Sequence, residues 1–220
     1  MNASDREILV LPRQLLPTRD RFIRADAAKE LITQWESHVE WMPRSDAETR
    51  SDLIQPIPCV LIESADEQFY VFRRTRKTRD DLKGRLSLLI GGHIDGPPTD
   101  QELQAIMEET LLREVEEELG VTKLPGLRFL GLVTDHSTIA SSRHIGVVFE
   151  AMLHGRLTTQ APEEFSARSL LSGKALGLET LFEVKAQSDP WSTILYEEYF
   201  IPRFMPDQSF QQVMPLLLSD

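Results

Sequence analysis

The sequence predicts a mixed α/β (α+β) layered domain, on the strength of three observations. Short apolar runs typical of strands occur before and after residue 100, a long helical segment separates them, and further helical segments follow towards the C-terminus. This order of strands, helix, strands and helices is typical of layered domains with a sheet. With 220 residues, the chain can form one sizeable domain or one domain with an extension.

In the first half, Ile8–Leu11 forms an apolar run that predicts a strand. Residues 26–37 have helical character, with apolar side chains at spacings of three and four. Residues 43–57 are polar and lead to Pro56 and Pro58, so we expect a connecting loop there.

Two further runs, 59–62 and 69–72, predict a hairpin with its turn at 64–67. Another strand is expected at 86–90, where Gly91-Gly92 ends it.

The long helix is predicted to begin after a capping box made by Thr99 and Glu102, and to end at Gly120. Beyond it, 128–133 and 145–152 predict strands, and the final part of the chain predicts helices at 165–171 and 191–200.

Composition limits the class of protein. No apolar run approaches the roughly 20 residues that span a bilayer, and the N-terminus lacks the pattern of a secretory signal. Cys59 is the only cysteine, so an internal disulfide is excluded. A net charge of −11 argues against general nucleic-acid binding. We therefore expect a cytoplasmic protein with a small-molecule ligand, and neither a membrane nor a nucleic acid as partner.

The charge is unevenly distributed. Residues 100–118 hold eight acidic residues and one basic residue, whereas residues 73–85 hold seven basic residues and two acidic ones. Such a pair of segments is suited to binding a metal ion and a phosphate together, although both are also compatible with ordinary solvated surface.

The most informative stretch is Arg-Glu-Val-Glu-Glu-Glu-Leu-Gly-Val at 113–121. On a helix, Glu114, Glu117 and Glu118 stand at i, i+3 and i+4, so their carboxylates share one face. Like charges this close repel one another, and a divalent cation would neutralise them. Mg²⁺ takes oxygen ligands and usually lies between protein carboxylates and substrate phosphates.

Gly91-Gly92 followed by this helix resembles the Nudix box of the Nudix hydrolases, over about residues 57–155. The second half of the box matches at every defining position. The first half departs from it, because Ala105 stands where the family has a glutamate and the loop after Gly92 is longer. A carboxylate from elsewhere could replace the missing one, and the sequence leaves four candidates open: Asp95, Glu102, Glu108 and Glu109.

The resemblance implies an α/β/α sandwich with a mixed sheet and a metal-dependent pyrophosphohydrolase that cleaves a diphosphate linked to another group, usually in a nucleoside diphosphate derivative. By resemblance, Glu114, Glu117 and Glu118 hold Mg²⁺ or Mn²⁺, and the Gly92 carbonyl adds a ligand. Arg113 orients a glutamate by a charge-assisted bond. Catalysis is thus expected of Arg113, Glu114 and Glu117, while Glu116 faces solvent.

Contacts to substrate are expected from residues near the box: His93, His144, Arg74 and Arg85. The general base stays open, with Glu163 and Glu164 as candidates that also fit the first turn of a helix. Glu150, in a strand, also fits an exposed partner of a basic residue.

Two alternatives compete with the hydrolase. One is a Nudix domain that binds a nucleotide without turnover, as a sensor or interaction module. The other is an isomerase of isopentenyl diphosphate, which would need a catalytic cysteine, whereas Cys59 lies in an apolar run typical of core. The sequence does not identify the substrate.

We divide the chain into an N-terminal extension, 1–55, and a Nudix domain, 56–220. The extension supplies apolar residues for a lid, for a homodimer interface, or for packing on its own chain: Trp35, Val39, Trp41 and Met42.

Overall fold

The computed structural model describes residues 6–16, 20–64, 68–74, 82, 84–96, 101–138, 141–153, 168–170 and 178–204. Its centre is a mixed sheet in the order β2-β8-β9-β4-β1-β3, with β7 also paired to β4. The strands are β1 (Glu7–Pro12), β2 (Phe22–Arg24), β3 (Glu40–Pro43), β4 (Leu53–Ser64), β7 (Leu89–Gly91), β8 (Arg128–Thr134) and β9 (His144–Leu153). A smaller sheet has the order β10-β5-β6, formed by β10 (Arg168–Leu170), β5 (Phe72–Arg74) and β6 (Leu86–Ser87).

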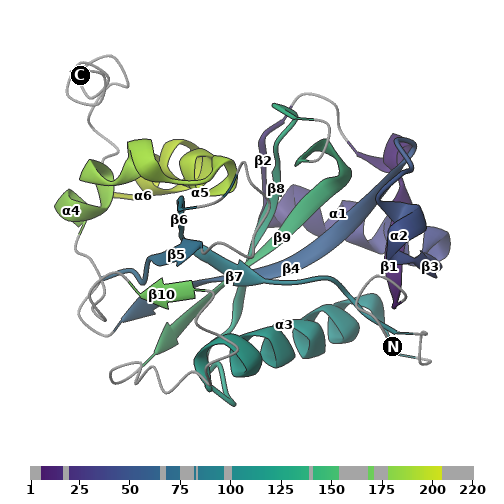
Figure 1. Cartoon of the computed structure of the whole chain (residues 1–220), viewed down its shortest axis with the longest axis horizontal. Coiled ribbons are helices and arrows are strands. Elements are labelled where there is room, and N and C mark those ends of the chain that lie inside the picture. The colour runs from purple at the N-terminus through teal and green to yellow at the C-terminus, as the bar shows by residue number, and fades with distance from the viewer. Residues whose placement is uncertain are drawn as a thin grey trace.

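Helices cover both faces of the central sheet. In Figure 1, α3 (Leu103–Leu119) lies below the sheet, and α4 (Leu178–Glu183), α5 (Pro190–Leu195) and α6 (Ile201–Phe204) lie above it. The remaining α-helices are α1 (Ala25–Trp35), which contacts β8, and the short α2 (Arg44–Ala47). Single turns are η2 (Arg13–Leu15), η3 (Glu36–His38), η5 (Ser141–Arg143) and η7 (Lys185–Gln187), and η8 (Tyr196–Phe200) is a π-helical turn. The predicted α/β/α sandwich with a mixed sheet is confirmed.

Strand β4 joins the two layers of core, because its side chains alternate between the faces of the sheet. Val60 and Ile62 pack in a cluster with Met107 and Val115 of α3. Their neighbours on β4, Cys59 and Leu61, are in a second cluster that includes residues of α5 and η8. Cys59 is buried there, as the apolar run predicts, and its Sγ lies 3.6 Å from the Val147 carbonyl oxygen.

The predicted loop at 43–57 is wrong. Helix α2 begins at Arg44, and β4 begins at Leu53 and runs through both prolines. On the edge of β4 opposite β9, Ile54 pairs with β1 and Cys59 pairs with β7, so Pro56 and Pro58 lie in the gap between these two partners. A residue without an N–H is tolerated where the strand edge on one side has no partner, although β9 pairs with β4 on the other side at both prolines.

Three other elements differ from the prediction. Residues 168–170 form a strand and not a helix, because they pair with β5. The strand at 86–90 is split at Leu88, whose N–H donates to the hydroxyl of Ser192 on α5. Helix α3 begins after Glu102 without a side-chain cap, so the capping box is wrong, whereas Gly120 ends the helix in the left-handed conformation as expected.

The N-terminal segment contributes strands to the central sheet. β1 pairs with β4, and β2 pairs with β8. Trp35 is fully buried, and Val39 and Trp41 pack against the same core cluster. Part of this apolar surface is therefore covered by the chain itself. The division at residue 55 stays a prediction.

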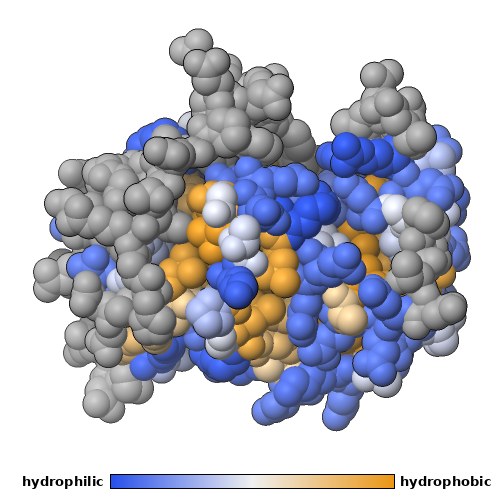
Figure 2. Space-filling model, turned by 90° about the horizontal axis from the view of Figure 1, so that it is seen from below, coloured by the Kyte–Doolittle hydropathy of each residue, from blue (hydrophilic) through white to orange (hydrophobic). Residues whose placement is uncertain are grey.

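Figure 2 shows the face that carries α3, where hydrophobic residues gather left of centre and hydrophilic ones surround them. The large hydrophobic side chains that are exposed among the described residues are Leu112 of α3, at 37%, and Met152 of β9, at 43%. None of the helices in the described part of the chain has the length and apolar character to cross a membrane.

Candidate active site

A pocket of about 680 Å³ opens where β4, β7, α3 and the N-terminal segment meet. Its wall includes the Gly-Gly turn, the start of the glutamate motif and several basic residues from other elements. The residues that line it are Arg6, Arg44, Glu48, Ile57, Cys59, Leu82, Leu89, Gly91, Gly92, His93, Asp95, Arg113, Glu114, Glu117, Asp135, Thr138, Ser141, Arg143, His144, Asp189, Pro190 and Trp191.

The Gly-Gly turn lies directly against the glutamate helix. A Cβ atom at Gly92 would come within 2.2 Å of the Glu114 carboxyl carbon and 2.4 Å of both its oxygens. A Cβ atom at Gly91 would come within 2.0 Å of the Pro58 carbonyl oxygen. Only glycine therefore permits this approach at either position, and it places the backbone of Gly92 beside the carboxylate of Glu114.

Arg113 connects the helix to the turn. Its Nη1 lies 2.8 Å from Glu114 Oε1 and 3.2 Å from Glu117 Oε1, and its Nη2 donates to the His93 carbonyl oxygen at 3.2 Å. The nearby carboxylates raise the pKa of Arg113 in spite of the lowering by burial, so the guanidinium stays charged. The side chain thus holds two glutamates and the backbone after Gly92 in fixed relation.

Of the four carboxylates that could replace the glutamate missing at Ala105, Asp95 lines the pocket. Its Oδ2 lies 3.6 Å from Arg113 Nη2 and 3.1 Å from Arg6 Nη1. Glu102 and Glu109 are exposed, and Glu108 accepts a hydrogen bond from Gln104 at 2.9 Å. The structure therefore brings Asp95, and not the other three, to the arginine of the motif.

The donor set suits a hard divalent cation. Glu114 and Glu117 offer carboxylate oxygens beside the backbone of Gly92, and the guanidinium of Arg113 already places a positive charge between the two carboxylates. Within the described residues, no three His, Cys, Asp or Glu side chains are assembled to hold a metal ion. Mg²⁺ is usually bound by one or two carboxylates together with substrate phosphates, so a three-ligand cage is not required.

His93 and His144 lie together at one wall of the pocket. Their rings are 5.5 Å apart and edge-on, and His93 Nε2 lies 2.8 Å from the Oε1 of buried Gln55. Burial first, and then the positive charge of Arg44 and neighbouring His144, lowers the pKa of His93 to about 3. His93 is therefore neutral near pH 7, and its Nε2–H donates to Gln55, so it offers no charge to a phosphate.

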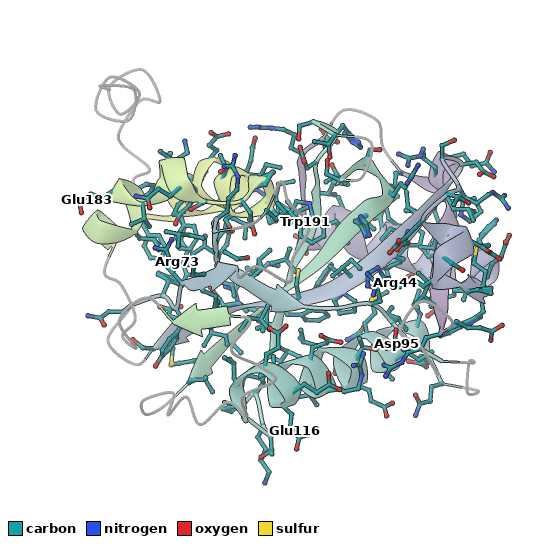
Figure 3. The ribbon with its side chains drawn as sticks, viewed as in Figure 1. Arg44, Arg73, Asp95, Glu116, Glu183 and Trp191 are labelled. Atoms are coloured by element: carbon teal, nitrogen blue, oxygen red, sulfur yellow. The ribbon has the colours of Figure 1, made fainter. Side chains whose placement is uncertain are left out.

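The other predicted site residues are placed as follows. Glu118 is partly buried and does not line the pocket, and Glu116 is exposed at the outer side of α3 (Figure 3). Arg85 donates to the Ser188 carbonyl oxygen at 3.1 Å and does not line the pocket either. The side chain of Arg74 and both base candidates, Glu163 and Glu164, lie outside the described residues.

Sequence reasoning missed the pocket residues that come from distant segments, among them Arg44, Arg143, Asp135 and Trp191. Figure 3 shows Arg44 and Asp95 on the same side of the molecule, with Trp191 nearer its centre. Asp135 is buried, and its carboxylate accepts from the N–H and the hydroxyl of Ser137 at 3.0 and 2.7 Å. None of these residues belongs to a local motif, so no spacing in the sequence marks them.

Glu150 lies outside this pocket, in a second polar cluster. It accepts hydrogen bonds from Arg128, from the Tyr199 hydroxyl at 2.8 Å and from Arg203 at 2.5 Å. Burial acts to raise the pKa of Glu150, but the hydrogen bonds and the charges of both arginines hold it below its ordinary value. Glu150 is thus a partner of basic residues, which is one of the roles that the sequence suggested for it. The expectation that it is exposed is wrong, because its side chain is buried.

Comparisons with known proteins agree with this geometry. The NUDIX domain model matches residues 53–192. Protein YmaB of Bacillus subtilis (strain 168) is 26% identical over 207 residues, which cover 90% of this chain and 98% of that protein. The crystal structure of Tm1382 matches with a TM-score of 0.68 and 23% identity, over 86% of this chain and 94% of that one.

The structure of DR0079 from Deinococcus radiodurans matches with a TM-score of 0.50 and 19% identity, over 74% of this chain and 93% of that one. These two structural matches show the fold. The family model covers well over half of the sequence and includes the Gly-Gly turn and the glutamate helix. The chain therefore belongs to the NUDIX domain family of the Nudix hydrolases.

Proposed function

We propose that this protein is a metal-dependent pyrophosphohydrolase that cleaves a diphosphate linkage in a nucleoside diphosphate derivative. The observation that carries the proposal is the meeting of Gly92, Arg113, Glu114 and Glu117 at one wall of a single pocket. Carboxylates held this close to one another and to a backbone carbonyl are suited to a cation that in turn binds phosphate.

Glu114, Glu117 and the Gly92 carbonyl would hold Mg²⁺ or Mn²⁺, with Glu118 as a further ligand from the same helix face. The ion would neutralise phosphate oxygens and acidify a water molecule. Arg113 keeps the carboxylates in position, because one of its nitrogens lies within hydrogen-bonding distance of both Glu114 and Glu117. Asp95 supports Arg113 from the other side and takes the place of the carboxylate absent at Ala105.

The N-terminal segment contributes to the same pocket. Arg6, Arg44 and Glu48 line it, although all three precede the residues that the family model matches. We therefore treat residues 1–55 as an extension that packs on the Nudix domain and completes its substrate pocket.

A screen of hydrolysis tests the proposal. The full chain is incubated with dinucleotides, sugar nucleotides, nucleoside triphosphates and coenzyme A derivatives, with Mg²⁺, with Mn²⁺ and with a chelator. We expect metal-dependent cleavage of a diphosphate linkage in at least one class. A nucleotide that binds tightly and stays intact under all three conditions would contradict the hydrolase and support the non-catalytic sensor.

A further inference from the structure

Among the described residues, Arg143 is a pocket residue whose charge lacks an acidic partner. It ends η5, is partly buried and lines the pocket. Its Nη1 donates to the backbone carbonyl of Glu48, and its Nε is buried without a hydrogen-bond partner among the described residues. A charge that is removed from water is costly unless it is paired.

The other arginines of the pocket are all paired. Arg6 bonds Asp95 at 3.1 Å, Arg113 bonds Glu114 at 2.8 Å, and Arg44 Nε bonds the Glu48 carboxylate at 2.8 Å. The Glu48 carboxylate is paired with Arg44, and Arg143 donates to the backbone oxygen of Glu48. Within the described part of the chain, Arg143 is therefore the pocket arginine without an ion pair.

The register of β4 gives the offset along this strand between the start of β9, next to Arg143, and the Gly-Gly turn. Gln55 pairs with His144, which follows Arg143, whereas Cys59 pairs with Gly91, which precedes Gly92. Four residues along a strand correspond to roughly 13 Å. The backbone of Arg143 is thus offset along β4 from the Gly-Gly turn, yet Arg143 and the glutamates line the same cavity.

We propose that Arg143 binds a second phosphate group of the substrate, distinct from the diphosphate that is cleaved. The inference rests on the proposed function and narrows its substrate class to nucleoside diphosphate derivatives that carry an additional phosphate. A guanidinium is suited to this task because its planar donors match phosphate oxygens two at a time.

Two pairs of compounds, each differing by one phosphate, provide the test: NADPH against NADH, and coenzyme A against dephospho-coenzyme A. The values of kcat/KM for hydrolysis with Mg²⁺, and Kd by calorimetry with a chelator, are measured for the unaltered protein, Arg143→Gln, Arg143→Lys and Arg50→Gln. Arg50 is a matched control, because it is exposed, pairs with Asp52 at 2.5 Å and does not line the pocket. Thermal unfolding of each variant shows whether the fold is retained.

We expect the unaltered protein to prefer the member with the extra phosphate by roughly 10- to 100-fold in at least one pair, as a charge-assisted hydrogen bond predicts. Arg143→Gln removes this preference, Arg143→Lys keeps part of it, and Arg50→Gln keeps all of it. Equal Kd values within both pairs for the unaltered protein, or a preference that Arg143→Gln leaves intact, would overturn the inference. Hydrolysis without preference overturns the inference alone, whereas preferential binding without hydrolysis overturns only the proposed function.

Discussion

The site depends on the absence of a side chain at Gly92. The carboxylate of Glu114 occupies the space that a Cβ atom would take, and Arg113 holds that carboxylate from the other side. Gly92 therefore determines where Glu114 lies as directly as the helix does. The sequence marks this glycine through the family motif, but its steric reason becomes visible only in the folded chain.

Replacement of Gly92 by alanine is expected to displace the Glu114 carboxylate. Because misplacement of a reacting group by about 1 Å can cost roughly 100-fold in rate, we expect kcat to fall by about that factor. Gly126→Ala is the control, since a Cβ atom there meets nothing within 4 Å, although its φ of +67° makes the substitution cost about 1 kcal/mol in stability. Hydrolysis assays and thermal unfolding of both variants check this, and an unchanged kcat in Gly92→Ala would refute the steric argument.

Among the helices and strands, the apolar runs predicted most strands, because a buried strand needs several consecutive apolar side chains whatever its partners are. Two predictions of secondary structure were wrong, because pairing between strands outweighs the local composition of the sequence. Pro56 and Pro58 indicate a loop, yet β4 accepts them in a gap between its partners, and residues 168–170 become a strand only through β5. The glutamate motif was visible because its residues are neighbours on one helix.

The rest of the pocket could not be predicted in this way. Arg44 follows β3, Arg143 precedes β9, and Trp191 lies on α5, so only the packing of three separate elements brings them to one cavity. Trp191 packs against β9, where a Cβ atom on Gly146 would come within 3.1 Å of its ring.

A hydrogen bond from Leu88, the residue between β6 and β7, connects the sheet to helix α5. The Leu88 N–H donates to the Ser192 hydroxyl at 2.8 Å, and the Ser192 N–H donates to Asp189 at 2.9 Å. Ser192→Ala leaves the buried Leu88 N–H without a partner, so we expect a loss of about 2 kcal/mol in the free energy of unfolding. Urea unfolding measures it, with exposed Ser45→Ala as the control. A loss below about 0.5 kcal/mol would show that this hydrogen bond is unimportant.

The polar cluster around Glu150 joins the central sheet to the C-terminal helices. Glu150 of β9 bonds Arg128 of β8, Tyr199 of η8 and Arg203 of α6, while Glu63 of β4 lies 3.5 Å from Arg203. These contacts lie away from the pocket residues. We therefore assign the cluster to stability and not to catalysis.

Glu150→Gln removes the negative charge that Arg128 and Arg203 contact. We expect the free energy of unfolding to fall by about 2 kcal/mol at pH 7, because both arginines are partly exposed and water screens their charges. The pKa of Glu150 is lowered by folding, so its stabilisation is present above the pKa of the unfolded chain and disappears as the pH falls through the lower folded value. The difference between the two proteins should shrink in acid. Urea unfolding over a pH series measures it, and a constant difference would contradict the assignment.

Two adjacent substitutions on α3 show whether the glutamate helix holds the metal for diphosphate cleavage. Glu117 lines the pocket and bonds Arg113, whereas Glu116 lies on the outer side of the same helix and does not line the pocket. The measurement is kcat/KM with Mg²⁺ for Glu117→Gln and Glu116→Gln, on the best substrate of the screen. We predict a fall of at least about 100-fold for Glu117→Gln and no change beyond about twofold for Glu116→Gln. Equal activity of the two variants would contradict the account.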